Sequence, residues 1–277
     1  MSVFSYPERG HWGDSKWRGN CSGHMYRDLF QVTAPKLFVD PMMGSGTSLE
    51  VAREMGIECV GLDLHQGFNA LHDSIVEAVG KEASLVFSHP PYGDIIVYSG
   101  NVWGEANGDD LSRCESEEDF HEKMHAVLLN QRTATLPGGY YGMLIGDKRK
   151  HGKYISYQAE QISRMPADEL AAVWIKQQHN CVSDTRTYAL MTMPFIKHEY
   201  VVLWQKPAKI QCALQMLSVL AKQCDARMKS TWKAIVRAAL CEIPESSDLD
   251  KLYGRIAGKA PERIAQNPHW RERSDKP

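Results

Sequence analysis

Short apolar runs alternate with amphipathic stretches through residues 36–207 of the chain. The runs are rich in β-branched and aromatic residues and are bounded by Gly, Pro or Asp, which favours buried strands. They lie at 37–39, 57–62, 85–87, 140–145, 170–175 and 200–204, with Pro137-Gly138-Gly139 opening the fourth. Segments of helical composition lie between them at 48–55, 70–79 and 120–135.

This alternation predicts a mostly parallel sheet with helices on both faces, which is a Rossmann-like α/β fold. Beyond residue 208 the pattern changes, because 212–240 has few helix breakers and predicts one long or two short amphipathic helices. We therefore expect an α/β domain over 1–207, with 1–35 as an N-terminal segment, followed by a helical extension over 208–277.

Composition narrows the class of protein. The chain is 43% hydrophobic and 24% charged and has no run of 18 apolar residues, so we expect no membrane span. The N-terminus lacks the apolar core of a signal peptide. Seven cysteines without a CxxC pair predict reduced thiols and no metal site. We expect a cytoplasmic protein without a membrane partner.

Charge is segregated along the chain although the net charge is only −2. Residues 101–125 contain eight acidic and two basic residues, a net −6, and residues 208–277 contain eight acidic and thirteen basic residues, a net +5. A short basic run lies at 148–153. Any nucleic-acid surface must therefore be local, and each segment could equally be a solvated face.

A glycine turn follows the first strand. Residues 39–47 read Val-Asp-Pro-Met-Met-Gly-Ser-Gly-Thr, and Gly44 and Gly46 let the backbone approach a ligand where a helix begins. No Lys follows, so the turn is not a P-loop. Asp63 ends the second strand sixteen residues after Thr47, where a carboxylate can accept hydrogen bonds from both hydroxyls of a ribose. The alternative is a plain tight turn.

A second motif, Ser88-His89-Pro90-Pro91-Tyr92, ends the third strand. The two prolines stop strand pairing and stiffen the loop. An exocyclic amine of a base is a weak nucleophile because its lone pair is delocalised, so its N–H groups need acceptors. The Pro90 carbonyl can be one acceptor and a side chain before the prolines the other, while Tyr92 can stack on a flipped base. The alternative is a stiff loop with a surface tyrosine.

These motifs resemble those of the amino-group DNA methyltransferases. Residues 40–47 are similar to that family's cofactor motif, 88–92 to its catalytic motif, and 136–147 and 198–207 to two later strands. The resemblance covers about 18–207 in one of the family's circular permutations, and it is greatest to Mu-like prophage adenine methyltransferases of low sequence specificity. It implies S-adenosylmethionine as cofactor. The cofactor-binding residues that it implies are Asp40, Pro41, Met42, Gly44, Ser45, Gly46, Thr47, Asp63 and, in the N-terminal closing segment, Asn20, Cys21 and Ser22.

One residue departs from the family pattern. His89 precedes the prolines where the family usually has Asp, Asn or Ser. Neutral imidazole accepts one hydrogen bond and protonated imidazole accepts none, so we expect activity to fall as the pH drops through about 6.5. Ser88 is the alternative acceptor, with His89 then a supporting residue. The short interval between Asp63 and Ser88 also predicts that one strand of the family's sheet is missing or displaced.

The expected partner is double-stranded DNA, held by basic residues. Lys229, Lys233 and Arg237 are four apart and form one stripe on a helix, although a solvated face explains them equally well. The basic run adds Lys148, Arg149, Lys150 and Lys153. A recognition insert could lie in 93–119 or 208–277, but its acidic character makes 93–119 unsuited to phosphates, so we expect relaxed specificity. A monomer and a homodimer both remain open.

Three alternatives to an adenine-N6 DNA methyltransferase remain. A cytosine-N4 enzyme shares the mechanism, and a serine near the prolines favours it. An RNA methyltransferase usually carries an added RNA-binding module, and only about 35 residues precede the first strand. A non-catalytic DNA-binding protein on a methyltransferase scaffold is favoured by His89 and disfavoured by the intact glycines, Asp63 and Pro-Pro-Tyr.

Overall fold

The computed structural model describes residues 2–179, 193–208, 249–259 and 261–265. The chain divides into two units, Met1–Ala208 and Lys209–Pro277. In the second unit the described residues form helices α8 (Leu249–Lys259) and α9 (Pro261–Ala265). The helices expected over 212–240, with the stripe of Lys229, Lys233 and Arg237, lie outside the described residues. None of the helices within the described ranges has the length and apolar character needed to cross a membrane.

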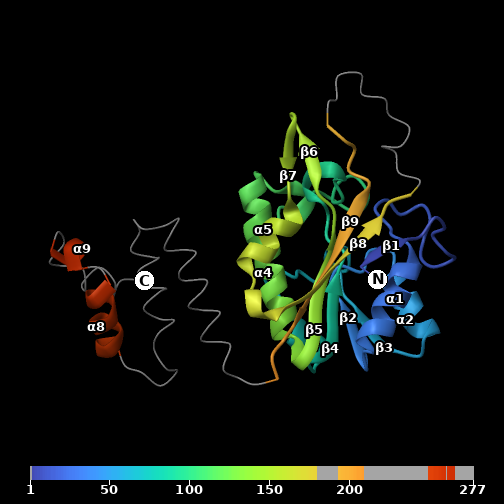
Figure 1. Ribbon diagram of the computed structural model, residues 1–277. Helices are drawn as coiled ribbons and strands as arrows, with labels where there is room; N and C mark the ends of the chain where they lie inside the picture. Colours follow the sequence, from blue (N-terminus) through green and yellow to red (C-terminus); the bar gives the residue numbers. More distant parts are fainter. Residues whose placement is uncertain (1, 180–192, 209–248, 260, 266–277) are drawn as a thin grey trace. The chain divides into compact units, whose positions relative to one another are not determined.

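The first unit is built on a seven-stranded sheet (Figure 1). Neighbouring strands run parallel except at β9, which is antiparallel to both of its neighbours. In spatial order the strands are β1 (Val3–Ser5), β8 (Leu170–Gln177), β9 (His198–Gln205), β5 (Thr135–Ile145), β4 (Ala83–Ser88), β2 (Leu37–Asp40) and β3 (Glu58–Gly61).

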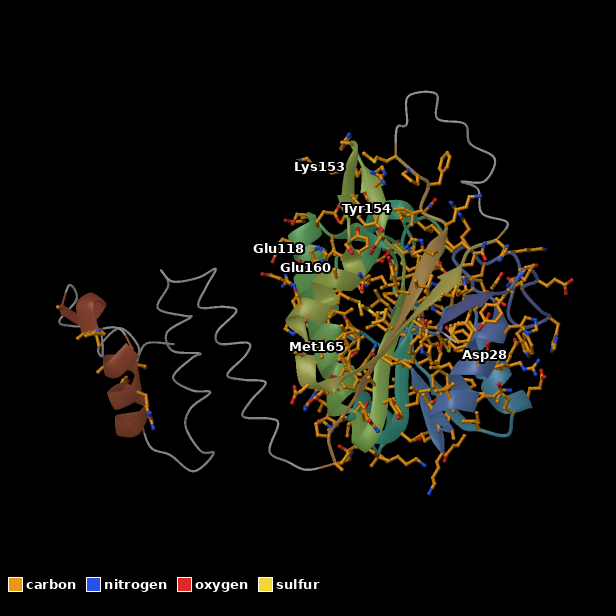
Figure 2. All side chains as sticks on the ribbon, viewed as in Figure 1. Asp28, Glu118, Lys153, Tyr154, Glu160 and Met165 are labelled. Atoms are coloured by element: carbon orange, nitrogen blue, oxygen red, sulfur yellow. The ribbon has the colours of Figure 1, made fainter. Side chains whose placement is uncertain are left out.

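Helices cover both faces of this sheet. Helices α1 (Gly23–Thr33) and α2 (Thr47–Glu54) pack on one face, and α4 (Glu117–Thr133), with α3 (Ile75–Val79) and α5 (Tyr157–Arg164) beside it, packs on the other. Arg164 joins α5 to α4 by pairing with Glu118 at 2.7 Å, and it pairs within α5 with Glu160, also at 2.7 Å. Figure 2 labels the two glutamates. The predicted fold class, a Rossmann-like α/β sheet with helices on both faces, is confirmed.

Strand alternation assigns the residues of β4 to these two faces. Leu85 and Phe87 belong to the core that α1 and α2 share with the sheet. Because successive side chains on a strand point to opposite faces, Val86 and Ser88 point toward α4. Ser88 is fully buried there, and Gln131 of α4 donates a hydrogen bond to its hydroxyl at 2.6 Å. The alternation of β4 therefore places Ser88, the first residue of the Ser-His-Pro-Pro-Tyr motif, on the face of the sheet that α4 covers.

Several boundaries differ from the sequence prediction. The helix expected over 70–79 spans only Ile75–Val79, because Asn69 forms a turn by bonding the backbone N–H of Leu71, and Ser74 caps the helix instead. Strand β5 begins at Thr135 and runs through Pro137-Gly138-Gly139, which was expected to precede it. Helix α1, strand β1, helix α5 and a two-stranded hairpin, β6 (Lys148–Lys150) with β7 (Lys153–Ile155), were not predicted.

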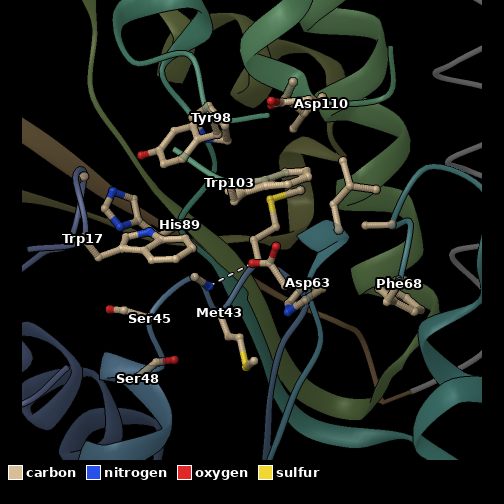
Figure 3. Close-up of a pocket in the computed structure, with 18 of the residues that line it drawn as sticks. Trp17, Met43, Ser45, Ser48, Asp63, Phe68, His89, Tyr98, Trp103 and Asp110 are labelled. Carbon is tan, nitrogen blue, oxygen red and sulfur yellow. Dashed lines mark hydrogen bonds between the residues drawn. The ribbon is translucent and has the colours of Figure 1, made fainter. Parts of the chain in front are cut away.

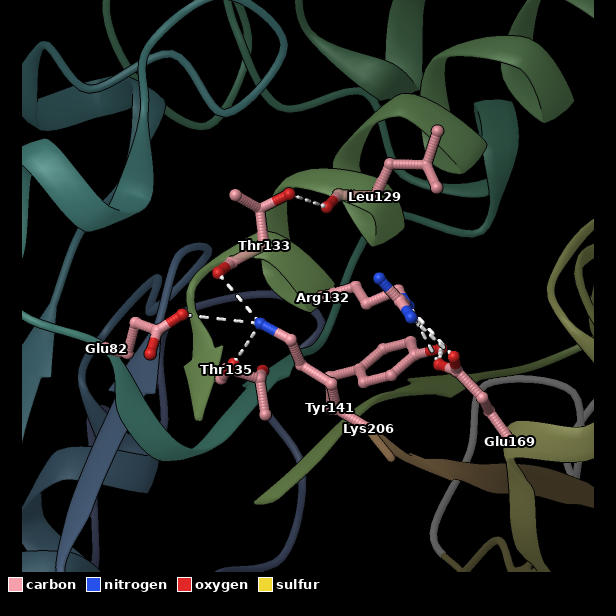
Figure 4. Close-up of polar contacts among 8 residues, drawn as sticks. All are labelled: Glu82, Leu129, Arg132, Thr133, Thr135, Tyr141, Glu169 and Lys206. Atoms are coloured by element: carbon pink, nitrogen blue, oxygen red, sulfur yellow. Dashed lines mark hydrogen bonds and ion pairs between the residues drawn. The ribbon is translucent and has the colours of Figure 1, made fainter. Parts of the chain in front are cut away.

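A buried polar network fastens α4 at the edge of the sheet where β5 and β8 begin (Figure 4). Glu169 is fully buried, receives a bidentate hydrogen bond from Arg132 and accepts a third from the Tyr141 hydroxyl at 2.6 Å. Each charge is paired and bonded, which is the condition for a buried ion pair to be tolerated. This network holds the scaffold at the edge opposite to the one where β2, β3, β4 and β5 end.

Candidate active site

Two cavities meet where β2, β3 and β4 end. The first cavity lies over the glycine turn, and the second lies between the Pro-Pro-Tyr loop, the β6–β7 hairpin, the end of β8 and the beginning of β9. In parallel α/β sheets this edge is where ligands bind. The residues that line both cavities are Gly19, Asn20, Cys21, His89, Pro91 and Tyr98. The two cavities therefore share a wall, to which the Pro-Pro-Tyr loop and the N-terminal segment both contribute.

The glycine turn forms the floor of the first cavity. Gly44 and Gly46 have φ values of +50° and +83°, which favour glycine. Asp40 supports the turn from below by accepting hydrogen bonds from the Met42 N–H at 2.9 Å and the Ser48 hydroxyl at 2.6 Å. Burial raises the pKa of Asp40 to about 7, against the lowering effect of these two hydrogen bonds. Asp40 therefore acts on the turn rather than on a ligand.

Asp63 connects the turn to the second strand (Figure 3). One carboxylate oxygen accepts the Gly44 N–H at 2.8 Å, and the other lies 2.6 Å from Nδ1 of His65. The Asp63 carboxylate, as the acceptor for the His65 ring, raises the pKa of His65, although burial opposes this shift. Asp63 is partly buried and borders the cavity, so lone pairs that the protein does not use can face a ligand's hydroxyl groups.

The predicted closing segment does contact the turn. Asn20 donates to the Ser45 hydroxyl at 2.9 Å and accepts from the Thr47 hydroxyl at 2.5 Å. Cys21 is buried in the shared wall, and burial raises the pKa of its thiol to about 12, so the thiol stays protonated. Of the predicted cofactor-binding residues, the first cavity is lined by Asn20, Cys21, Pro41, Met42, Gly44, Ser45, Thr47 and Asp63, while Asp40, Gly46 and Ser22 do not border it.

The acidic stretch 93–119 folds against the first cavity. Asp110 is buried and accepts hydrogen bonds from the Ser99 N–H at 2.7 Å and the Ser112 N–H at 2.8 Å. Some acidic side chains of the stretch 93–119 therefore form hydrogen bonds inside the fold. The stretch also supplies part of the cavity wall. The aromatic lining residues that the sequence did not assign to the site are Trp17, Tyr26, Phe68, Tyr98 and Trp103. All of them except Tyr26 are labelled in Figure 3. Two tryptophans in otherwise polar loops were the available signal.

Ser88 and His89 have different surroundings. Ser88 is bonded to Gln131 inside the protein and borders neither cavity, so its hydroxyl is not positioned to accept from a substrate. His89 lines both cavities, and its Nε2 lies 2.8 Å from the Tyr92 hydroxyl. Burial lowers the pKa of His89 to about 4, with Glu199 opposing the shift and Lys176 adding to it. The predicted loss of an acceptor near pH 6.5 is therefore corrected to a much lower pH.

Tyr92 is more constrained than the sequence suggested. Its hydroxyl donates to Glu199 of β9 at 2.8 Å, and its ring lies against Gly146, where a Cβ atom would be 2.7 Å from the ring. The ring borders the second cavity. Stacking on a flipped base stays a prediction, and the hydroxyl has a separate partner that fixes the ring.

The basic run forms the β6–β7 hairpin beside the second cavity (Figure 2). Lys148 is only 6% exposed and its ammonium pairs with Asp94 at 2.6 Å and Glu117 at 2.8 Å. Lys150 also pairs with Asp94, at 2.6 Å. Arg149 lies over the Tyr154 ring, and Lys153 is exposed. Lys148 thus anchors the loop after Tyr92, and Arg149 and Lys153 are better placed to meet phosphates.

Comparison with known proteins gave structural similarities alone, because no family model and no curated protein matches the chain. TrmN from Thermus thermophilus is 15% identical with a TM-score of 0.40, over 68% of this chain and 50% of TrmN. TTHA0409 from the same organism, a proposed DNA modification methylase, is 17% identical with a TM-score of 0.32, over 73% of this chain and 72% of that one. The chain therefore spans about half the length of TrmN.

Proposed function

We propose that this protein is an S-adenosylmethionine-dependent methyltransferase that methylates the exocyclic N6 of adenine in double-stranded DNA. One observation carries the proposal: a cavity over the glycine turn and a second cavity share a wall that contains His89 and Pro91. A transfer between two large ligands needs one site for each ligand and one point of contact between them. Here the point of contact lies in the Ser-His-Pro-Pro-Tyr motif, whose residues can accept hydrogen bonds from an amino group.

The first cavity fits the proposed cofactor. Gly44 has positive φ, and a Cβ atom there would come within 3.1 Å of the Trp17 indole nitrogen, so the backbone of the turn stays bare. Asp63 would accept the ribose hydroxyls, and Trp17, Phe68 and Trp103 offer faces for an adenine. The Asn20–Cys21 segment would close over the methionine end. When bound, S-adenosylmethionine supplies an electrophilic methyl group on a sulfonium.

The chain's own residues would prepare the amino group. The Pro90 carbonyl and the His89 ring would each accept one of its N–H groups, so that the nitrogen lone pair is directed toward the first cavity. Tyr92 would pack on the base, which must leave the duplex at a cost of about a few kcal/mol. Contacts from Arg149, Lys153 and the extension over 208–277 to phosphates would offset that cost.

A direct assay tests the proposal. The full chain is incubated with duplex DNA and isotope-labelled S-adenosylmethionine, the DNA is digested, and the nucleosides are identified by mass spectrometry. N6-methyladenine in many sequence contexts is expected. N4-methylcytosine would overturn adenine as the target base, and a single strict site would overturn relaxed specificity. In a parallel incubation with RNA in place of DNA, label in the RNA but none in the DNA would favour an RNA enzyme. Absence of cofactor binding by calorimetry would favour a non-catalytic DNA-binding protein.

A further inference from the structure

We propose that Glu199 is a positioning residue which, through the Tyr92 hydroxyl, holds His89 in the tautomer that carries its proton on Nε2, so that the lone pair of Nδ1 is presented to the target amino group. This inference rests on the proposed function, because it assigns a task to a residue of that site. It concerns the atom that accepts, and it names a carboxylate on β9 that the sequence motifs did not identify.

Three strands bring the participating side chains together. His89 and Tyr92 follow the end of β4, Glu199 is the second residue of β9, and Lys176 lies near the end of β8. Because β9 is antiparallel to β8, Lys176 is the direct cross-strand partner of Glu199. The beginning of β9 therefore lies at the edge where β4 and β8 end, although these segments are far apart in sequence.

Glu199 is held in its ionised form. Lys176 donates to one carboxylate oxygen at 2.5 Å, and Gln178 and Tyr92 each donate to the other at 2.8 Å. Burial alone would favour the neutral acid, but the charge of Lys176 and these hydrogen bonds keep the pKa of Glu199 below its usual value. A carboxylate can only accept hydrogen bonds, so the direction of each bond to it is fixed.

Proton accounting then assigns the tautomer of His89. The Tyr92 hydroxyl has one proton, and it gives that proton to Glu199 at 2.8 Å. Toward His89 Nε2, also at 2.8 Å, the same oxygen can only accept, so Nε2 must carry a hydrogen. Neutral imidazole has one N–H, and therefore Nδ1 has the lone pair. Among the described residues, the hydrogen bond through Nε2 is the one that the His89 ring makes.

The charges around His89 are consistent with this role. Its loop contributes Tyr92, β9 contributes Glu199, β8 contributes Lys176, and the shared wall adds the protonated Cys21 and Tyr98. The ring is neutral over the pH range in which the enzyme would work. It can accept from an amino group without first losing a proton.

The same arrangement can take up the proton that the reaction releases. The amino nitrogen would use its lone pair to form the new N–C bond while the bond between that methyl group and the cofactor's sulfur breaks and leaves its electron pair on sulfur, which becomes a neutral thioether. The electron pair of one N–H bond would then restore the nitrogen lone pair as the proton moves to Nδ1. His89 then has two N–H groups, of which Nε2–H still donates to Tyr92. The negative charge of Glu199 stabilises this imidazolium until the proton leaves through the second cavity.

Nitrogen NMR of the full chain tests the tautomer without depending on activity. The protein is labelled with ¹⁵N-histidine, and the His89 signals are assigned by their loss in His89→Gln. We expect the pattern of a neutral ring protonated on Nε2. In Glu199→Gln, Lys176 should retain the amide oxygen, and the NH₂ group should donate to Tyr92 and to a Gln178 amide that has turned its oxygen toward it. The Tyr92 proton then turns toward His89 and the tautomer reverses to Nδ1–H. An unchanged tautomer in this variant would overturn the proposal.

Two further variants secure the result if Glu199→Gln does not fold. Tyr92→Phe keeps the Lys176–Glu199 pair but removes the connecting hydroxyl, so His89 should become a mixture of tautomers; a ring that stays wholly Nε2–H contradicts the proposal. Tyr200→Phe is the matched control, because its hydroxyl lies 2.8 Å from His198 Nε2 in an equivalent pair. It should change the His198 signals and leave those of His89 as they were.

Kinetics separates this inference from the proposed function. If the chain methylates DNA, Glu199→Gln should lower kcat about a hundredfold, within the range known for general acid–base groups, and leave the Kd for S-adenosylmethionine unchanged. Tyr92→Phe should lower kcat about tenfold, which is the effect expected from the loss of one hydrogen bond. A reversed tautomer in a chain that methylates nothing would support the positioning and refute the function. If the tautomer reversed and kcat did not change, His89 would not be the acceptor of the amino group.

Discussion

Gln131 on α4 donates a hydrogen bond to the Ser88 hydroxyl at 2.6 Å, and this places Ser88 inside the protein while the next residue, His89, lines both cavities. Two adjacent residues of one motif are therefore divided between scaffold and site. The sequence left open which of them accepts from the substrate, and the geometry favours His89.

This division predicts different losses for two alanine variants. Ser88→Ala should destabilise the fold by about 1–3 kcal/mol, because it leaves the buried Gln131 amide without its partner, and should change the methylation rate less than threefold. His89→Ala should reduce kcat about a hundredfold with little change in stability. Chemical denaturation and initial rates measure the two effects. The reverse order of the activity losses would return the role to Ser88.

The pH profile gives a second prediction. His89 must be neutral to accept, and its pKa is lowered to about 4, so kcat should be flat from about pH 8 to 5 and fall only as the pH approaches 4. The unfolded chain protonates this histidine near its ordinary value of about 6.5, so His89 also contributes a loss of folding stability as the pH falls from about 6.5 to 4.

His89→Asn is the control for that profile, because an amide accepts a hydrogen bond and does not titrate. Its acid limb should be absent, while thermal unfolding at each pH shows that the protein is still folded. A wild-type rate that already halves near pH 6.5 would mean that the ring is less buried when DNA is bound.

Cofactor affinity gives a third prediction. Asp63→Ala removes the acceptor for the ribose hydroxyls and releases the Gly44 N–H, so the Kd for S-adenosylmethionine should rise about ten- to a hundredfold by calorimetry. Glu58→Gln is the matched control, because Glu58 begins β3, the strand that precedes Asp63, and pairs on the surface with Lys81. Its Kd should not move. If both variants bound S-adenosylmethionine with equal affinity, Asp63 would not be a cofactor-binding residue.

The sequence predicted those parts of this protein that depend on local order. Apolar runs located six strands of the sheet, and the glycine turn and Pro-Pro-Tyr loop followed from residues adjacent in the chain. The short interval between Asp63 and Ser88 predicted that it lacks one strand of the family's sheet. The described residues of this interval form α3 and β4 and no further strand. The alternation of β4 could have placed Ser88 toward α4, had the strand been extended to it.

Other parts of the site depend on contacts between distant segments. Glu199 meets Tyr92 across 107 residues, and Lys148 meets Asp94 across 54, so neither pair has a local pattern that announces it. Lys148 belonged to a basic run that suggested phosphate binding, but its burial between two carboxylates makes it structural. The shift of the His89 pKa likewise comes from burial, which the sequence of one loop does not specify.

The network at the opposite edge gives a fourth prediction, for stability. Glu169 is fully buried and pairs with Arg132, so Glu169→Ala should lower the free energy of unfolding by about 3–5 kcal/mol, since it leaves a largely buried guanidinium without its carboxylate. Glu58→Ala, which breaks the exposed pair with Lys81, should cost at most about 1 kcal/mol. Denaturant titration compares them. Similar costs would mean that water or Tyr141 compensates Arg132.

The β6–β7 hairpin gives the last prediction, which concerns DNA. Each phosphate contact releases counterions, so replacing Arg149 and Lys153 together by Ala should flatten the plot of log K against log salt by up to about 1.8, or about 0.9 per contact. Lys148→Met should leave this slope unchanged, because its ammonium is already neutralised by Asp94 and Glu117, and should instead destabilise the loop that follows Tyr92. Fluorescence anisotropy across a salt series measures the slope. If Lys148→Met changed the slope as much as the double variant, DNA binding would have to open the Lys148 pairs, and the hairpin would act as a moving part of the site.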